Sequence, residues 1–455
     1  MLLRFAVENF KSFKDKQVFS MIAGKYTKHS NHVLSVNNKR LLKGSFFFGG
    51  NASGKSNLLE AVSFSKRIVL DGVRNANLTN MHFRIEKEYA YKPGVFQFDL
   101  FSNGHFYSYG FALSYQNAII EEEWLYLCDS SDVAIFERFV EDGKHVIHTD
   151  CRFSDPSLKQ RFTIYSEDLA DDCLFLSEIA ERKLTEHEDF AAYKDVYSWF
   201  QRLEVIFPGS RYLRKDRLFS EKNSSMSMAK LLHLFDTGIE DINVSWDKAE
   251  DVLDSYPDTV RNVLNALIKE VEKRLSDSKK EDNDSLAEVD VTFAGKYLRL
   301  KKKDNQLMAA QLLMNHGNND DLFEMKDESD GTQRLFDLLP VYTVSRQPKV
   351  IFVDELDRSF HTMLVQRFIE GFYKLTDGAE SQLIATVHDS NVMNLDLLRQ
   401  DEIWFVERMI HHDSRIYSLS MYKERFDKKV SKDYMLGRYG AIPCIDQAYL
   451  DEEEA

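Results

Sequence analysis

The chain has 455 residues, 43% of them hydrophobic, which excludes a disordered chain and allows two compact units or one interrupted unit. Its formal charge of −15 argues against general adhesion to nucleic acid, so any contact with DNA requires a local basic surface. The four cysteines form no CxxC pair and no stretch reaches the roughly 18 apolar residues of a membrane span, so we expect a soluble, cytoplasmic protein without a disulfide framework or a zinc site.

Two short strands and a helix are predicted in the first 70 residues. Apolar runs at residues 2–7 and 45–48 have the length and composition of strands, and the second run ends in glycines. Residues 56–69 carry apolar side chains at helical spacing. Strand, glycine loop and helix therefore follow one another in the order that a phosphate-binding loop requires.

The glycine-rich stretch at residues 49–56 satisfies the pattern GxxxxGK[ST]. Its glycines allow successive backbone N–H groups to point at phosphate oxygens, Lys55 neutralises the outer phosphates, and Ser56 offers a hydroxyl to Mg²⁺. The strand before it and the helix after it argue against a chance glycine turn. We expect the nucleotide to be held by Gly49, Gly50, Asn51, Ala52, Ser53, Gly54, Lys55, Ser56 and Asn57.

The pattern changes twice in the middle of the chain. From residue 95 to about 148, short alternating segments separated by turns indicate an antiparallel subsheet. Residues from about 157 to 285 indicate mostly amphipathic helices, for example at 228–235 and 260–275. We interpret this helical block as an insertion.

Strands return after the insertion. They are predicted at about 288–303, and two buried strands follow at 349–353 and 382–386. The chain is therefore predicted to be divided into residues 1–155, a helical insertion at 156–285, and residues 286–455.

The strand at 349–353 ends in two carboxylates, Asp354 and Glu355. In a parallel sheet the carboxyl end of a strand faces the ligand crevice, so Asp354 is expected to hold Mg²⁺ and Glu355 to polarise the attacking water. The strand at 382–386 is followed by His388, which we expect to bond the outermost phosphate and report its presence. The structural alternative is an ordinary polar strand end.

A short polar stretch, Glu-Ser-Asp-Gly-Thr-Gln at residues 328–333, precedes an apolar helix at 335–339. Ser329 is a plausible N-cap, and Gly331 permits close approach of the backbone, so this helix start is a second potential anion site. A simple capped helix is the alternative, and the stretch alone favours it.

In this order, the motifs resemble those of the ABC-type ATPases of the SMC, RecF and overcoming-lysogeny group. The resemblance rests on Asn-Phe-Lys-Ser-Phe at residues 9–13, the GxNxSGKS loop, the Ser-Asp-Gly-Thr-Gln stretch, the Asp-Glu strand end and the histidine after the next strand. Within that group the chain looks most like the stand-alone "AAA family" ATP-binding proteins of bacterial phage-defence operons, of the abortive-infection and restriction-linked kind. Residues 438–443 also look like the closing segment of those proteins.

The resemblance implies an α/β fold, an ABC-type P-loop ATPase head with an antiparallel β subdomain, interrupted by the mostly helical insertion. ATP and Mg²⁺ are the implied cofactors, Lys55, Glu355 and His388 the implied catalytic residues, and Ser56, Asp354 and Gln97 the implied metal-binding set. Two heads would close on ATP, with Ser329 and Gly331 of one chain meeting the γ-phosphate held by the other. Asp357 would make a further contact between the two heads.

The implied function is that of a slow regulatory ATPase in an anti-phage defence complex. Its heads would pair on ATP, giving at least a dimer, and would control a separate effector protein, a nuclease or a toxin. The stretch after His388 is too short for the Toprim nuclease that overcoming-lysogeny relatives carry, so we expect any nuclease to be a separate protein. The trigger would be a nucleic acid or a phage protein, and no membrane partner is expected.

Three other functions remain as alternatives. The first is a RecF- or SMC-like DNA-repair ATPase that acts on DNA directly. A non-hydrolysing scaffold is the second, although the Lys55, Asp354 and Glu355 set speaks against it. The ATPase subunit of a membrane transporter is the third, and nothing in the sequence provides a membrane domain.

Basic clusters at 211–217 and 301–303 could contact nucleic acid, but solvated surface charge is the favoured interpretation.

Overall fold

A computed structural model describes residues 1–141, 144–208, 229–254, 261, 288–293, 296–303, 306–342, 348–422 and 429–442. The chain divides into two compact units. Unit 1 comprises Met1–Pro208, Val344–Asp357 and His361–Ala455, and unit 2 comprises Gly209–Thr343 with Arg358–Phe360.

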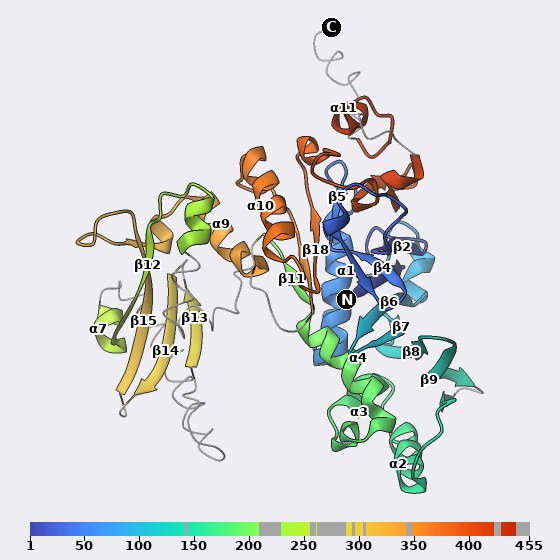
Figure 1. The fold of residues 1–455 in the computed structure, drawn as a ribbon. Helices are drawn as coiled ribbons and strands as arrows, with labels where there is room; N and C mark the ends of the chain where they lie inside the picture. The colour runs from blue at the N-terminus through green and yellow to red at the C-terminus, as the bar shows by residue number, and fades with distance from the viewer. Residues whose placement is uncertain are drawn as a thin grey trace. The chain divides into compact units, whose positions relative to one another are not determined.

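The first sheet of unit 1 has six strands in the order β11-β17-β18-β5-β19-β20, of which Figure 1 labels β11, β18 and β5. Neighbouring strands pair in parallel, except that β20 runs antiparallel to β19. The strands are β5 (Gly44–Phe48), β11 (Glu204–Ile206), β17 (Lys349–Val353), β18 (Ser381–Thr386), β19 (Ile403–Arg408) and β20 (Ser414–Ser418). The strands predicted at 45–48, 349–353 and 382–386 are thereby confirmed as β5, β17 and β18.

The second sheet of unit 1 has seven antiparallel strands in the order β10-β9-β8-β7-β6-β1-β2. They are β1 (Leu2–Glu8), β2 (Gln17–Ser20), β6 (Gly94–Ser102), β7 (His105–Ser114), β8 (Ile119–Cys128), β9 (Asp132–Glu141) and β10 (Lys144–His148). The predicted antiparallel subsheet is therefore confirmed over β6 to β10. A separate hairpin pairs β3 (Val33–Val36) with β4 (Lys39–Leu42).

One hydrophobic core joins the two sheets of unit 1. Helix α1 (Lys55–Asp71) contributes its buried face, which includes Leu58, Leu59, Val62 and Phe64, and this core also holds side chains from both sheets. Burial of such large apolar side chains is the main favourable contribution to folding. The other α-helices described in unit 1 are α2 (Pro156–Glu167), α3 (Phe175–Ala180), α4 (Ala191–Arg202), α10 (Thr362–Leu375) and α11 (Val430–Met435).

Unit 2 is built on an antiparallel sheet with the strand order β12-β15-β14-β13, and β16 pairs with β15. The elements are β12 (Asp241–Lys248), α7 (Ala249–Asp254), β13 (Glu288–Phe293), β14 (Lys296–Lys303), β15 (Gln306–Asn315), β16 (Phe323–Glu324) and α9 (Asp330–Leu338). Strand β12 comes from the predicted insertion, whereas its partner β15 comes from beyond it.

The predicted insertion at 156–285 contains α2, α3, α4 and β11 in unit 1 and β12 and α7 in unit 2. Its described residues are mostly helical. The helix predicted at 260–275 lies outside the described residues except for Arg261, and the one at 228–235 is described from Ala229 onward. Within the described ranges, no helix combines the length and the hydrophobicity that a membrane crossing requires.

A buried pair of titratable groups holds the start of the β3–β4 hairpin against the parallel sheet. The Glu402 carboxyl contacts His32 Nδ1 at 3.0 Å and accepts hydrogen bonds from the backbone N–H of Arg399 at 2.8 Å and from the Tyr373 hydroxyl at 2.8 Å. Burial raises the pKa of Glu402 to about 8 and lowers the pKa of His32 to about 3. The folded pair therefore keeps one proton between these two values.

The pair predicts a specific dependence of stability on pH. Above the unfolded pKa of His, about 6.5, the unfolded chain holds no proton on these two groups while the folded pair still holds one, so stability is lost as the pH rises toward 8. Glu402→Gln should remove this loss, because the amide stays neutral. We expect the free energy of unfolding of the parent to fall relative to the variant by about 1 kcal/mol between pH 6.5 and 8, measured by urea denaturation. A constant difference across this range would contradict the assignment.

Candidate functional site

The phosphate loop joins β5 to α1 and is closely packed at its two outer glycines. A Cβ atom on Gly49 would lie 2.2 Å from the backbone oxygen of Val406, in the neighbouring strand β19. Gly54 has a φ of 107°, and a Cβ there would lie 2.3 Å from Ser414 Oγ. Only glycine fits these positions without a shift of the surroundings, because one lacks space and the other also lies in the left-handed region.

Lys55 starts α1 and is only 5% exposed. Its ammonium group donates to the backbone oxygens of Gly49 at 2.8 Å and of Gly50 at 3.1 Å, so it folds back over the loop. Burial lowers the pKa of Lys55, and the nearby carboxylates of Asp354, Asp357 and Glu355 oppose that shift. The lysine of the phosphate loop therefore lies within electrostatic reach of the acidic strand end.

Two serines outside the phosphate loop, Ser12 and Ser414, form hydrogen bonds with the loop and the start of α1. Ser414, at the start of β20, donates to the backbone oxygen of Ser53 at 2.6 Å, and its hydroxyl lies 2.8 Å from that of Ser12. The Ser12 hydroxyl also accepts a hydrogen bond from the Asn57 side chain at 2.8 Å. The sequence contained Ser12 only as part of its opening motif and gave no signal for Ser414.

The acidic strand end is held by one threonine. The Thr386 hydroxyl, at the end of β18, donates to Asp354 Oδ1 at 2.7 Å and accepts a hydrogen bond from the backbone N–H of Glu355 at 2.7 Å. Asp354 is buried, whereas Glu355 is half-buried and has a φ of 49°. A non-glycine residue in this left-handed conformation is strained, which is common at functional sites.

The turn after β18 brings His388 to the same carboxylates. His388 Nε2 lies 3.8 Å from Glu355 Oε1, and both side chains are partly open to solvent. Asp357 Oδ2 accepts hydrogen bonds from the backbone N–H groups of His388 at 2.9 Å and Asp389 at 2.7 Å. Asp357, which the resemblance assigns to a contact between heads, thus fixes the histidine turn of its own chain.

Two buried oxygens at this edge of the sheet have no hydrogen-bond partner within the described part of the chain: Ser53 Oγ and Asp357 Oδ1. Unpartnered buried polar atoms are rare and costly, and they often mark the position of an absent ion or ligand. With the buried Asp354 carboxylate and the Ser56 hydroxyl, they form an oxygen set of the kind that Mg²⁺ prefers. The residues present therefore fit a magnesium–phosphate group.

The predicted signature residues Ser329 and Gly331 lie in unit 2. Ser329 is the N-cap of α9, and its hydroxyl accepts a hydrogen bond from the backbone N–H of Thr332 at 3.1 Å. A Cβ on Gly331 would lie 3.0 Å from the backbone oxygen of Ser359. The capped helix is thus present, and the structure does not place it relative to the phosphate loop in unit 1.

Gln97 lies in β6 of the antiparallel sheet. Its amide group donates to Asp99 at 3.1 Å and Ser108 at 3.2 Å, and its oxygen accepts from Lys16 at 3.3 Å. These three partners lie outside the phosphate loop and the acidic strand end. Its predicted role in metal binding stays a prediction.

The basic cluster at 211–217 lies outside the described residues, and residues 301–303 lie on β14, where only the backbone is described. Their contact with nucleic acid therefore also stays a prediction.

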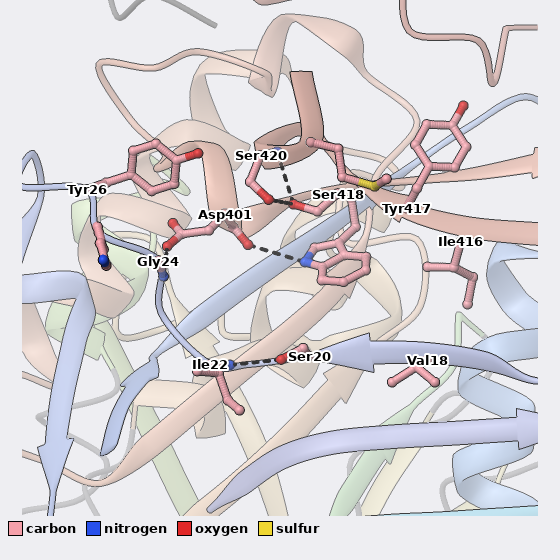
Figure 2. A pocket seen from close by; sticks show the side chains of 13 residues that line it. Val18, Ser20, Ile22, Gly24, Tyr26, Asp401, Ile416, Tyr417, Ser418 and Ser420 are labelled. Atoms are coloured by element: carbon pink, nitrogen blue, oxygen red, sulfur yellow. Dashed lines mark hydrogen bonds between the residues drawn. The ribbon is translucent and has the colours of Figure 1, made fainter. Parts of the chain in front are cut away.

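A cavity of about 670 Å³ lies between the edge strands β2 and β20 (Figure 2). Figure 2 shows the Asp401 carboxylate directed at the backbone N–H of Gly24, at 2.7 Å, and the hydroxyls of Ser418 and Ser420 beside each other. None of its lining residues is a sequence-predicted site residue. The residues that the motifs single out therefore do not line this cavity.

A family model described as "AAA domain, putative AbiEii toxin, Type IV TA system" matches residues 45–132 and 163–394, more than half of the chain. The chain belongs to this AAA domain family. The match spans the phosphate loop, the acidic strand end and His388. Together with the parallel sheet that carries the loop and the antiparallel sheet packed with it, the family confirms the predicted fold class, an ABC-type P-loop ATPase head.

Two solved structures are similar to the chain over nearly its whole length. One is "Crystal structure of the SmcHead bound to the C-winged helix domain of ScpA", at 15% identity and a TM-score of 0.41, covering 93% of this chain and 98% of that one. The other is the SMC head domain from Thermotoga maritima, at 12% identity and a TM-score of 0.38, covering 92% and 98%. A search of curated proteins found no match to the sequence.

The packing of the phosphate loop predicts unequal effects of two glycine substitutions. Gly54 and Gly104 both have left-handed backbones, with φ of 107° and 94°, but a Cβ on Gly104 would meet nothing within 4 Å. Gly104→Ala should therefore cost only the conformational penalty of about 1–2 kcal/mol, whereas Gly54→Ala also displaces Ser414 and should cost about 3 kcal/mol. Urea denaturation of both variants measures the difference. Equal losses would contradict the packing.

Proposed function

We propose that the chain binds and hydrolyses ATP with Mg²⁺ and that it does so as a slow regulatory subunit of an anti-phage defence complex. The observation that carries the ATPase part is the meeting of Lys55 with the Asp354–Glu355 strand end at one edge of the parallel sheet. Membership in the AAA domain family supports the same activity.

Each residue of the site has a role that follows from its position. The backbone N–H groups of the loop and the Lys55 ammonium would bind the β- and γ-phosphates, and Ser56 with Asp354 would hold Mg²⁺. The bound Mg²⁺ would neutralise charge on the phosphates. Glu355, half-buried and beside His388, orients the attacking water, and His388 contacts the γ-phosphate.

Water exclusion is incomplete in a single head, because the Glu355 and His388 side chains remain 33% and 41% exposed. A second copy of the chain that covers this edge would complete the site, and the capped N-terminus of α9, with Ser329 and Gly331, is the element we assign to that contact. Closure would then depend on ATP, because its phosphates supply the charge that the second helix end binds.

Pairing of heads gives ATP a means to control another protein. We assign that control to a separate effector, a nuclease or a toxin, held or released as the heads close and reopen. The family description names a putative AbiEii toxin of a type IV toxin–antitoxin system, and this supports a role of the chain in a system of that kind. The acidic charge of −15 favours a protein effector over direct, general binding to DNA.

Two substitutions should separate binding from hydrolysis. Lys55→Ala removes the ammonium group that binds phosphate, so affinity for ATP should fall at least about tenfold. Glu355→Gln keeps the shape of the side chain but not its basicity, so binding should persist while kcat falls by about 100-fold or more. Equilibrium binding and steady-state ATP turnover measure the two effects.

The matched controls are the exposed pair Lys159→Ala and Glu167→Gln on α2, which should behave as the parent. Light scattering should show Glu355→Gln pairing in the presence of ATP, and added bare DNA should leave the turnover of the parent unchanged. Parent-like turnover in both Lys55→Ala and Glu355→Gln would contradict the assignment of the ATP site to these residues. Strong stimulation by DNA would favour a repair function instead.

A further inference from the structure

The C-terminal part of the described chain makes a direct hydrogen bond to the phosphate loop. The backbone N–H of Gly50 donates to the backbone oxygen of Ala441 at 2.9 Å. The same oxygen accepts a hydrogen bond from the Tyr434 hydroxyl, also at 2.9 Å. One carbonyl group, 391 residues along the chain from Gly50, therefore fixes the first turn of the loop together with a tyrosine of α11.

We call residues 429–442 the C-terminal strap. Its aromatic side chains anchor it to the parallel sheet: the Phe405 ring of β19 stacks on Tyr434 and on Tyr439, with ring centroids 5.6 and 5.7 Å apart. The Tyr439 backbone oxygen accepts hydrogen bonds from the hydroxyls of Tyr417 at 2.6 Å and Tyr422 at 3.3 Å. The strap is thus attached to β19, which pairs directly with β5, the strand that leads into the phosphate loop.

A left-handed turn orients the Ala441 carbonyl toward the phosphate loop. Gly440 and Ala441 have φ values of 69° and 57°, so two consecutive residues take the left-handed conformation. A Cβ on Gly440 would lie 2.7 Å from Glu407 Oε1, and Ala441 is buried although its conformation is unfavourable for a residue with a side chain. Surrounding contacts must hold such a strained turn in place, which is typical of functional positions.

The strap also packs near the other half of the site. Helix α11 contacts the short helical turn at Ser390–Val392, which begins two residues after His388. In Figure 1 α11 is drawn in red near the C-terminal end of the chain. The strap therefore contacts the site at two points, Gly50 of the phosphate loop and the turn after His388. A shift of the loop on nucleotide binding would act on the strap through these contacts.

We propose that the C-terminal strap positions the phosphate loop for nucleotide binding, with the Ala441 carbonyl as the positioning group. This role rests on the proposed function, because it concerns the same site. Ala441 does not reach the substrate by itself; it holds the loop in the shape in which the amides that follow Gly50 can converge on phosphate. Because thermodynamic coupling is reciprocal, bound nucleotide stabilises the docked strap by the same free energy by which the docked strap increases the affinity for nucleotide.

Three substitutions test the strap without touching the loop. Tyr434→Phe removes only the hydroxyl that bonds Ala441 and keeps the stacking on Phe405. Ala441→Val opposes the left-handed turn, since branched side chains are strongly disfavoured there, whereas Ala441→Gly permits it. The control is Tyr197→Phe on α4, whose hydroxyl bonds Glu181 far along the chain from the strap.

We expect Ala441→Val and Tyr434→Phe to raise the dissociation constant of a non-hydrolysable ATP analogue with Mg²⁺ about fivefold to tenfold. The KM for ATP should rise in parallel while kcat stays within about twofold, because groups that touch the reacting atoms are unchanged. Ala441→Gly and Tyr197→Phe should bind as the parent does. Hydrogen exchange of the loop peptide that contains Gly50 should become faster in Tyr434→Phe without nucleotide.

Unchanged affinity in both Ala441→Val and Tyr434→Phe, with intact folding, would overturn the role of the strap, and so would an equal loss in Ala441→Gly. A parent protein that does not bind the analogue at all would instead overturn the proposed function. The nucleotide-free exchange measurement separates the two failures, because it reports on the contact between Gly50 and Ala441 whether or not ATP binds.

Discussion

Parallel pairing of β5, β17 and β18 is the constraint on which the rest of the site depends. The register matches Phe47 with Thr386 and Val353 with Ala385, so all three strands end at the same edge of the sheet. A parallel sheet exposes the groups that follow its strands at one crevice. The phosphate loop, the acidic pair and the histidine turn therefore meet there, although about 300 residues of chain separate the loop from the other two.

The location of the candidate site was largely predictable, because each of its parts follows a strand that the sequence shows clearly. In two places an apolar run ends abruptly, at Gly49 and at Asp354 and Glu355. The run predicts a strand, and the residues directly after it are the groups that face the ligand crevice, so one local pattern predicts both. The bracing groups could not be predicted in this way. Ser414 lies in no local motif, and although Ala441 belongs to the segment 438–443, nothing in that segment indicates its contact with Gly50. Thr386 has the pattern of an ordinary strand residue, and only the structure shows its hydrogen bond to Asp354.

The organisation of the middle of the chain was harder to predict for a related reason. Strand β12 lies in a stretch dominated by helical patterns, and it pairs with β15, more than 60 residues later. Pairing between strands so far apart is determined by tertiary structure and leaves only a weak trace in local periodicity. Unit 2 therefore combines residues from the predicted insertion with residues that the motifs grouped with the ATPase head.

Two features of this edge of the sheet are typical of functional positions. Glu355 is in a strained left-handed conformation beside a histidine 3.8 Å away, and Ser53 and Asp357 keep buried oxygens without partners in the described residues. A bound triphosphate with its metal ion would supply partners for these two oxygens.

The most direct measurement is a crystal structure of the chain soaked with Mg²⁺ and a non-hydrolysable ATP analogue. The account predicts phosphate oxygens bonded to the Lys55 ammonium and the loop amides, with the metal between Ser56 and Asp354. An analogue bound elsewhere, for example in the cavity between β2 and β20, with Lys55 still donating to Gly49 and Gly50, would contradict it.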